Sequence, residues 1–417
     1  MPTSRKIVKK MKPTASQPVI TNPDVIKEIL ERGTVDIIPK LELEKLLQSG
    51  RTLRVKLGID PSGPDLHLGH AVPLRKLRQF QRAGHQAVIV IGDWTARIGD
   101  PTGKNKMRPQ LTAATVKKNA DQYLKQLFLI LDKKNTQVVW QSAWFNKFTL
   151  QEIIDLISKF TVAQLMERED FQKRQQAGGE IGYHEPMYAL LQAYDSVVIK
   201  ADIELGDPAQ LFNMLRGRDL QGMCGQSPQN IITVKTLIGL DGTQKMGKSL
   251  HNYIALLASP DEMYGQIMSI PDSLIVQYFE LCTDISVNDL AAIEQQLINR
   301  SLNPRDLKMR LAHTIVGLYH SDKDAAEAET KFISLFQKKE LPSDVPTKKI
   351  GQPIPLLKLL INCGLVQSAS DGRRVIAEGG IKIDGRVVKD PMVLVAPTTN
   401  GVLISRGKRQ FCKIISA

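Results

Sequence analysis

Residues 53–59 alternate between apolar side chains and polar or small ones, and this period of two predicts a β-strand with one buried face. Residues 74–82 instead carry apolar side chains at helical spacing, with lysine and arginine on the other face, and Gly84 follows where such a helix would end. The turn between the two elements contains Asp-Leu-His-Leu-Gly-His at 65–70. Free N–H groups and the positive end of the helix dipole gather at such a turn, which is therefore typical of phosphate-binding sites.

Strand and helix patterns continue to alternate as far as residue 250. Residues 87–91 form an unbroken apolar run, which is typical of a parallel strand covered on both faces. Further strands are predicted at 138–140, 201–205 and 231–237, and the helical patterns between them include an inserted helical segment at about 120–180. The sequence therefore predicts an α/β fold, with a doubly wound parallel, Rossmann-like sheet over residues 51–250.

The segments on either side of this region have a different character. Residues 1–50 contain a basic N-terminal arm and a short helical lead-in, and residues 251–342 show helical patterns only, which predicts an all-α domain. Residues 343–353 are rich in proline and lysine and indicate a linker. Residues 354–417 predict a small basic α+β domain that contains a hairpin with Asp384-Gly385 at its turn.

Composition narrows the range of partners. Lysine and arginine number 56 against 43 aspartates and glutamates, and the net charge of +13 favours a polyanionic partner. No apolar run approaches the roughly 20 residues of a membrane span, and the four cysteines are far apart, with no Cys-x-x-Cys pair. We therefore expect a soluble, cytoplasmic protein with free thiols and no membrane partner.

Two interpretations fit residues 242–249, which read Gly-Thr-Gln-Lys-Met-Gly-Lys-Ser. The segment matches the P-loop expression G-x-x-x-x-G-K-S, but a P-loop also needs a helix directly after it and a later strand that ends in a magnesium-binding acid. Nothing after residue 250 predicts such a strand, so a P-loop nucleotidase is the remote alternative. The other interpretation is a mobile loop whose two lysines reach a triphosphate and stabilise a pyrophosphate leaving group.

Polar side chains at predicted strand ends are further candidates for a site. Asp60, Asp93 and Asp100 lie at the edge where open α/β sheets bind ligands. A loop aspartate is also a common capping or turn residue. His67 and His70 have a spacing that could hold zinc, but no third ligand is placed nearby, so no metal site is predicted.

The predicted helix at 184–198 carries three polar side chains on one face. Tyr188, Gln192 and Asp195 recur at spacings of four and three. A solvated helix face gives the same pattern, so these residues alone leave open whether the face belongs to a binding site.

The motifs taken together resemble those of the class I aminoacyl-tRNA synthetases. His-Leu-Gly-His at 67–70 is similar to the HIGH motif, and Lys-Met-Gly-Lys-Ser at 245–249 is similar to the KMSKS motif. The resemblance narrows to the bacterial-type tyrosyl-tRNA synthetases through the segments at 57–62, 98–103, 188–195 and 303–308. Residues 354–417 resemble an S4 RNA-binding domain, with Asp-Gly-Arg-Arg at 371–374 and Ile-Lys-Ile-Asp-Gly at 381–385.

This resemblance implies an aminoacyl-tRNA ligase with a two-step reaction. The carboxylate of tyrosine attacks the α-phosphate of ATP to give tyrosyl-adenylate and pyrophosphate, and the tyrosyl group then passes to the 3′ end of tRNA(Tyr). ATP enters as a substrate with Mg²⁺, and no tightly bound metal or organic cofactor is implied. The family also implies a homodimer, with an interface that we expect within residues 120–180.

The resemblance carries functional roles to matching positions of this chain. The catalytic set that it implies comprises His67, His70, Lys104, Lys245, Lys248 and Ser249. The ATP-binding set comprises His67, Gly69, His70, Gly206, Asp207 and Lys248. The set around tyrosine comprises Lys56, Gly58, Asp60, Asp100, Tyr188, Gln192, Asp195 and Gln210, and the RNA-binding set comprises Arg373, Arg374 and Lys382.

One loop departs from the family pattern. Residues 206–210 read Gly-Asp-Pro-Ala-Gln where the family usually has Gly-Gly-x-Asp-Gln, whose second glycine allows close approach to the adenylate and whose aspartate binds its ribose. Lys56 also stands where part of the family has a tyrosine. The departures keep three alternatives open: a paralogue for another amino acid, an inhibitor-resistant form, and a catalytically weak RNA-binding protein.

Overall fold

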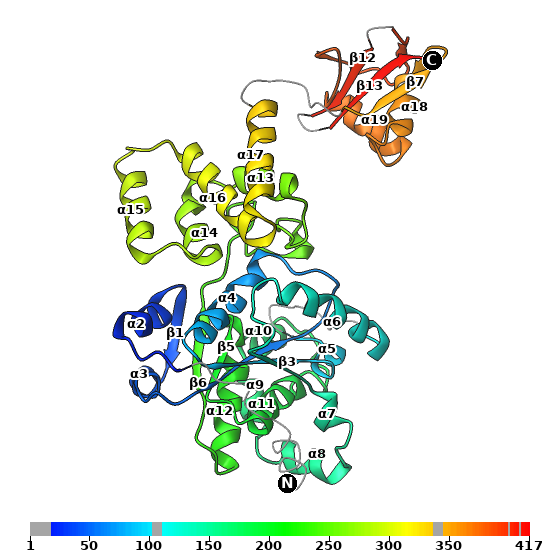
Figure 1. Cartoon of the computed structure of the whole chain (residues 1–417). Helices are drawn as coiled ribbons and strands as arrows, with labels where there is room; N and C mark the ends of the chain where they lie inside the picture. The colour runs from blue at the N-terminus through cyan, green and yellow to red at the C-terminus, as the bar shows by residue number, and fades with distance from the viewer. Residues whose placement is uncertain (1–17, 102–110, 337–344, 399–400, 408–409) are drawn as a thin grey trace. The chain divides into compact units, whose positions relative to one another are not determined.

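A computed structural model describes residues 18–101, 111–336, 345–398, 401–407 and 410–417. The chain divides into two compact units, residues 1–322 and 323–417 (Figure 1). The expected N-terminal arm lies mostly outside the described residues. Among the described residues, no helix has the length and apolar character needed to cross a membrane.

A six-stranded sheet forms the centre of the first unit. Its order is β1-β6-β5-β2-β3-β4, and all neighbours are parallel except β1, which is antiparallel to β6. The strands are β1 (Thr34–Ile38), β2 (Arg54–Ile59), β3 (Gln86–Ile91), β4 (Thr136–Trp140), β5 (Ile203–Gly206) and β6 (Asn230–Val234). The predicted doubly wound parallel sheet is therefore confirmed.

The expected helical lead-in before residue 50 is wrong in one part. Two helices, α2 (Pro23–Glu31) and α3 (Lys40–Gln48), flank the strand β1 there. β1 exists because its backbone pairs with β6, where Ile37 lies opposite Ile232. That pairing partner lies almost two hundred residues further along the chain, so local periodicity did not reveal the strand.

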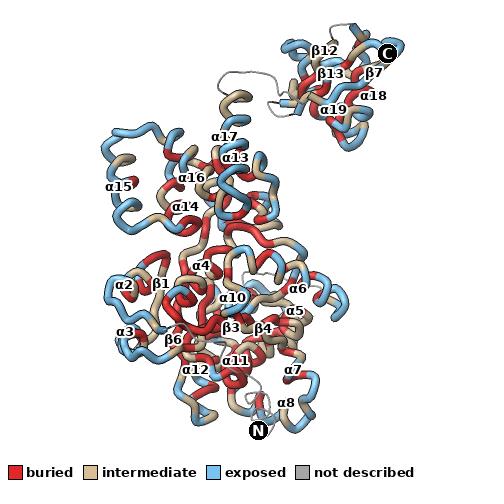
Figure 2. The backbone as a smooth tube through the Cα atoms, viewed as in Figure 1, coloured by how far each residue is buried: buried red, intermediate tan, exposed pale blue. Residues whose placement is uncertain are grey.

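Helices cover both faces of the sheet (Figure 1), and the strand β3, between β2 and β4, is buried along its whole length. On one face lies α4, and on the other lie α11 and α12, which pack against each other. The helices of this region are α4 (Leu68–Arg82), α5 (Thr95–Ile98), α6 (Ala113–Leu127), α7 (Ser142–Phe145), α8 (Leu150–Ile157), α9 (Val162–Met166), α10 (Glu169–Gln176), α11 (Met187–Ile199) and α12 (Leu211–Met223). Figure 2 shows the burial concentrated in the sheet and α11.

The strand order reverses between β2 and β5. From β2 the sheet extends through β3 and β4 on one side, and through β5 and β6 on the other. Open α/β sheets bind ligands at such a switch point, beyond the carboxyl ends of the strands. The carboxyl ends of β2 and β5 are Ile59 and Gly206. These ends therefore define the position at which a ligand site is expected.

Helices alone follow in the first unit after residue 257. They are α13 (Pro260–Met268), α14 (Ile275–Cys282), α15 (Val287–Ile298) and α16 (Pro304–Tyr319), with a short 3₁₀ turn η3 (Asp272–Leu274). The segment that matches the P-loop expression ends in another 3₁₀ turn, η2 (Lys248–Leu250), and no described strand of this unit follows it. A P-loop needs both a helix and a later core strand, so this alternative is excluded.

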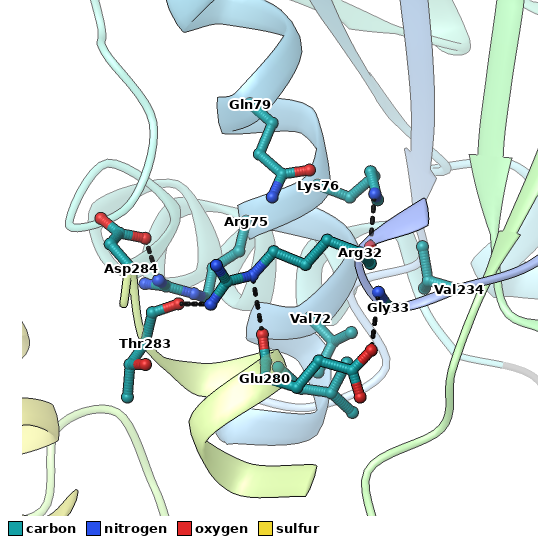
Figure 3. Close-up of a pocket in the computed structure, with 11 residues that line it drawn as sticks. Arg32, Gly33, Val72, Arg75, Lys76, Gln79, Val234, Glu280, Thr283 and Asp284 are labelled. Atoms are coloured by element: carbon teal, nitrogen blue, oxygen red, sulfur yellow. Dashed lines mark hydrogen bonds and ion pairs between the residues drawn. The ribbon is translucent and has the colours of Figure 1, made fainter. Parts of the chain in front are cut away.

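Helix α14 is tied to α4 and to the end of α2 by buried charges (Figure 3). The Arg32 guanidinium donates to the backbone oxygens of Glu280 and Thr283 at 3.1 and 2.8 Å, where α14 ends. The Lys76 ammonium, on α4, donates to Ile29 O at 2.7 Å, at the end of α2. Cations suit helix C-termini because the carbonyl groups there lack helical partners. This junction fixes the direction of α4, whose other end begins beside His67.

The second unit begins with α17 (Asp322–Phe336) and continues into a small α+β body. Its sheet has the order β10-β9-β12-β13-β7. Its elements are β7 (Thr347–Ile350), β8 (Ile354–Pro355), α18 (Leu356–Asn362), α19 (Ala369–Ala377), β9 (Ile381–Ile383), β10 (Arg386–Val387), β11 (Leu394–Val395), β12 (Val402–Arg406) and β13 (Gln410–Ser416). The predicted hairpin is confirmed, and Asp384 and Gly385 at its turn both have positive φ, as a two-residue hairpin turn requires.

Candidate functional site

Two histidines occupy the turn at the start of α4. His67 is the N-cap residue, and its backbone N–H donates to Nδ1 of His70 at 3.2 Å. The proton of the neutral His70 ring is therefore on Nε2, which makes Nε2 a hydrogen-bond donor. Burial, with the nearby Lys248 cation, lowers the pKa of His67 to about 4, and burial also lowers the pKa of His70 well below its ordinary value. Both rings are thus neutral near pH 7.

The lysine loop lies directly against this turn. Leu68 N donates to Ile254 O at 3.0 Å, which joins the segment after the loop to the start of α4. A Cβ added at Gly69 would lie 3.0 Å from the His67 ring and 3.5 Å from Cβ of Met246, so the two motifs pack closely on either side of this glycine. The structure therefore brings the predicted phosphate-binding motifs together, although they are far apart in the sequence.

The two lysines of this loop differ in their surroundings. Lys248 is half-buried, and its Nζ lies 5.5 Å from the centre of the Tyr123 ring, a cation–π distance. Burial lowers the pKa of Lys248. Lys245 and Ser249 are exposed. Lys248 thus points into the region of the histidines, whereas Lys245 and Ser249 line the outer side of the loop.

Carboxylates gather beyond the ends of β2 and β3. The Tyr188 hydroxyl donates to Oδ2 of Asp60 at 2.9 Å, and the Thr95 hydroxyl donates to Oδ1 of the same residue at 2.7 Å. Gln210 Nε2 donates to Oδ2 of Asp100 at 2.6 Å. These side chains come from α5, α11 and the segments that follow β2, α5 and β5, and together they form an anionic lining suited to a primary ammonium group.

Asp195 lies deeper, on the buried face of α11. Its Oδ2 accepts a hydrogen bond from Gln141 Nε2 at 2.8 Å, while its Oδ1 is buried and accepts no hydrogen bond of ordinary geometry in the described part of the chain, with the Trp144 side chain near the same carboxyl. Burial raises the pKa of Asp195 to about 8, against the opposing effect of the Lys56 charge. An unpartnered buried carboxyl oxygen is costly, so this atom indicates a place for a ligand hydroxyl. The solvated-face alternative for this helix is excluded, since Tyr188 and Asp195 are buried.

Lys56 lies beneath the site. It is fully buried, and its Nζ is 2.8 Å from Oε1 of Glu204, 2.9 Å from Gln192 O and 2.8 Å from Oγ of Ser196. An ammonium group has three N–H donors, so these protein atoms use all of them. Lys56 therefore fixes the position of α11 on the sheet. Gly58 lies two residues further along β2 and is exposed at the edge of the site.

The unusual loop at 206–210 is well braced. Oδ1 of Asp207 accepts from Ala209 N at 2.9 Å and caps the short 3₁₀ turn η1 (Pro208–Gln210), while Oδ2 accepts from the Thr236 hydroxyl at 2.8 Å. A Cβ at Gly206 would come within 2.8 Å of Met214 Sδ, so a larger residue here would require the Met214 side chain to shift. Ala209 is exposed. The Asp207 side chain thus holds the turn of this loop in place from both of its carboxyl oxygens.

The remaining predicted residues lie elsewhere. Lys104 falls outside the described residues. Asp93 acts as a loop brace, since its Oδ1 accepts from Ser142 N at 2.9 Å. In the second unit, Arg373, Arg374 and Lys382 are all exposed, and Arg374 is paired with Asp371 at 2.8 Å.

Two important residues escaped the sequence reasoning. Gln141 directly follows β4, so the same rule that selected Asp60 could have selected it. Its Oε1 accepts from Thr95 N at 2.9 Å, which leaves its amide N–H to face Asp195. Arg168 is almost fully buried and donates to Oδ1 of Asn213 at 3.0 Å and to Oδ1 of Asp100 at 3.4 Å. The sequence around Arg168 contains no pattern that identifies it as a site residue.

Family models and known proteins identify the family of this chain. A model described as "tRNA synthetases class I (W and Y)" matches residues 48–337, and one described as "Tyrosine--tRNA ligase SYY-like C-terminal domain" matches residues 337–414. The chain is 48% identical over 391 residues to a tyrosine–tRNA ligase of Moorella thermoacetica, a match that covers 93% of this chain and 94% of that protein. It is 47% identical to "Tyrosine--tRNA ligase 2" of Clostridium acetobutylicum, which covers 93% and 98% of the two chains.

Solved structures share the fold. A C-terminally truncated mitochondrial tyrosyl-tRNA synthetase of Aspergillus nidulans superposes with a TM-score of 0.63 at 20% identity, over 80% of this chain and 97% of that one. A tyrosyl-tRNA synthetase from Archaeoglobus fulgidus, complexed with L-tyrosine, gives a TM-score of 0.60 at 21% identity, over 73% and 99%. At these identities the likeness concerns the fold alone.

Proposed function

The chain belongs to the tyrosine–tRNA ligases of the class I tRNA synthetase family, and from this premise we propose how its residues divide the reaction. The enzyme joins tyrosine to tRNA at the expense of ATP. No side-chain nucleophile is needed, because the substrate carboxylate itself attacks the α-phosphate. The protein's task is therefore to position the reactants and to stabilise charge on the phosphates.

The ATP phosphates are proposed to lie at the start of α4. The neutral His70 offers an Nε2–H donor, and the N-terminus of α4 adds free N–H groups and its dipole. Lys248, with Lys245 and Ser249, would stabilise the negative charge that grows on pyrophosphate as it leaves. ATP would enter as its Mg²⁺ complex, with phosphate and water oxygens around the metal.

Tyrosine is proposed to lie between Asp100 and Asp195. Its ammonium group would bind Asp100, Tyr188 and Gln192, with Asp60 and Gln210 holding these groups in place. Its phenolic hydroxyl would form a hydrogen bond with Oδ1 of Asp195, the observation that carries this assignment, because that buried oxygen makes no hydrogen bond of ordinary geometry in the described part of the chain. A substrate without the hydroxyl would leave the oxygen unpaired, so phenylalanine would be rejected.

The ribose of ATP is proposed to bind at Asp207. A carboxylate has about four lone-pair sites, and Ala209 N and the Thr236 hydroxyl use two of them. The remaining sites can accept from ribose hydroxyls. Asp207 would thereby replace the aspartate that position 209 lacks, which supports an active ligase over a catalytically weak RNA-binding protein.

Pyrophosphate exchange tests these assignments. The purified chain is given each of the twenty amino acids in turn, and the exchange of labelled pyrophosphate into ATP is measured. We expect exchange with tyrosine alone at an ordinary rate. Exchange with another amino acid would identify an altered paralogue, and no exchange by a folded chain would support the RNA-binding alternative.

A homodimer is proposed through the inserted helices. Leu150, Ile154 and Val162, on or next to α8 and α9, are 72%, 45% and 74% exposed. Large exposed apolar side chains that cluster in this way are typical of protein interfaces. Sedimentation of the wild type and of Ile154→Asp tests this point, because the charge should shift the chain towards monomer.

Transfer RNA is proposed to contact the helices after residue 260 and the second unit. Arg373 and Lys382 are exposed cations that could contact RNA phosphates, and the cytoplasm is the compartment we expect. Removal of residues 350–417 should leave tyrosine-dependent exchange intact and abolish transfer to tRNA. Equal loss of both reactions would contradict this division of labour.

A further inference from the structure

Two cysteines lie side by side in the second unit. Cys363 is the C-cap residue of α18, and Cys412 lies on β13. Their Sγ atoms are 2.8 Å apart, and both are free thiols. A disulfide bond is about 2.05 Å long, so the sulfur atoms need to move by less than an ångström to form one.

The surroundings of the two thiols hold them in place. Cys412 is completely buried in the apolar core of the unit, among side chains such as Leu359 and Ile414, and Cys363 packs against the same core. Cys363 retains partial exposure at the end of its helix. One sulfur is therefore reachable by a small solute, and the other is kept next to it by packing.

We propose that Cys363 and Cys412 form an oxidisable dithiol, at which a peroxide closes a disulfide bond between α18 and β13. The Cys363 thiolate attacks one oxygen of the peroxide, the O–O bond breaks, and a sulfenic acid and water form. The Cys412 sulfur then attacks the Cys363 sulfur and displaces a second water. Two thiols lose two protons and two electrons in total, and hydrogen peroxide accepts them as two waters.

Oxidation of the Cys363–Cys412 pair should be slow. Burial and the neighbouring thiol raise the pKa of Cys363 to about 12. The thiolate is the reactive form, so little of it exists near pH 7. We therefore expect closure in minutes to hours, and faster closure at higher pH.

Formation of the disulfide would stabilise the structure around it. The disulfide joins residues 49 positions apart, which restricts the unfolded chain and stabilises the closed region. It would also pin the end of α18, which packs against α19 in the same unit. The reaction of the first unit would be unaffected, since neither thiol belongs to it.

The test uses the full-length chain treated with hydrogen peroxide at pH 8.5, followed by proteolysis without reductant and mass spectrometry. We expect a linked pair of peptides containing Cys363 and Cys412, 2 Da lighter than the sum of the two. Titratable thiols in denaturant should fall from the four of the sequence to two. Cys224→Ser, which alters a half-buried cysteine of the first unit, should still form the link, and Cys363→Ser should not.

Three results would overturn the proposal: a link that involves Cys224 or Cys282, a Cys363 sulfenic acid that persists until trapped by dimedone, and a link that forms only after denaturation. Hydrogen exchange gives a second, independent measurement. Peptides from α18 and β13 should exchange about tenfold more slowly in the oxidised wild type, and this protection should be absent from Cys363→Ser. If hydrogen exchange is unchanged in a chain that mass spectrometry shows to contain the disulfide, the disulfide does not stabilise α18 and β13.

Discussion

Gln141 Nε2 donates to Oδ2 of Asp195 at 2.8 Å, while Oδ1 of that carboxyl accepts no hydrogen bond of ordinary geometry in the described structure. The amide cannot be reversed without losing other contacts, because Oε1 of Gln141 accepts from the backbone and hydroxyl of Thr95. Gln141 therefore selects which oxygen of Asp195 is available to a ligand. This relationship is the basis on which we propose that a buried carboxyl discriminates between tyrosine and phenylalanine.

Replacing either residue should reduce that discrimination. For Asp195→Ala we expect the ratio of kcat/KM for tyrosine over phenylalanine to fall by about 10³-fold, because the buried acceptor is lost. For Gln141→Ala we expect a smaller loss of about tenfold, since the acceptor remains but loses its orientation. Amino-acid-dependent pyrophosphate exchange measures both ratios. An unchanged ratio in Asp195→Ala would place the phenol elsewhere.

Stability should depend on pH through the same carboxyl. The pKa of Asp195 is raised to about 8 by burial, whereas an unfolded aspartate titrates near pH 3.9. Between these values the native state binds more protons than the unfolded state, so the contribution of Asp195 to stability is lost as the pH rises towards 8. The Tm of Asp195→Asn minus that of the wild type should therefore increase from pH 5 to pH 8. Parallel curves without ligand would contradict this expectation.

The buried pair of Lys56 and Glu204 should be costly to break. Lys56→Met leaves the Glu204 carboxylate buried without its cation, which should destabilise the chain by about 3–5 kcal/mol. Glu204→Gln added to Lys56→Met should recover much of this loss, because no isolated charge remains. Urea unfolding measures both variants. If the double variant is no more stable than the single one, packing and not charge accounts for the loss.

Lys248 should affect the rate of adenylate formation and not the binding of tyrosine. We expect Lys248→Ala to lower the rate of pyrophosphate exchange by about 10²-fold at unchanged KM for tyrosine, because the charge on the leaving group loses a cation. Lys134→Ala, an exposed lysine of the same unit, is the matched control and should behave as the wild type. A rise in KM for tyrosine with an unchanged rate would argue against a role at the phosphates.

Asp207 should contribute to the binding of ATP. Asp207→Asn keeps a side-chain oxygen for the cap on Ala209 but removes the charge that favours ribose hydroxyl donors. We expect KM for ATP to rise about tenfold and KM for tyrosine to stay constant. Thr236→Val, which removes the brace on Oδ2, should give a similar but smaller change. A lower KM for ATP in Asp207→Asn would mean that the carboxylate repels the nucleotide.

The sequence by itself determined the architecture of the catalytic region and the two phosphate-binding motifs. The strand period at 53–59 and the unbroken apolar run at 87–91 are local features, as are the glycines and histidines of the turn at 65–70. Such features depend on neighbours within a few residues, so they can be identified before the fold is known.

Only the tertiary structure decided what each polar group contacts. Lys56 reaches Glu204 because parallel pairing of β2 with β5 puts them opposite each other, and this register makes the lysine a support and not a ligand contact. Gln141 meets Asp195, and Cys363 meets Cys412, through packing between elements that are distant in the sequence. β1 likewise exists because β6 pairs with it. Strand register and helix packing are long-range properties, and they fix which oxygen, nitrogen or sulfur is left for a ligand.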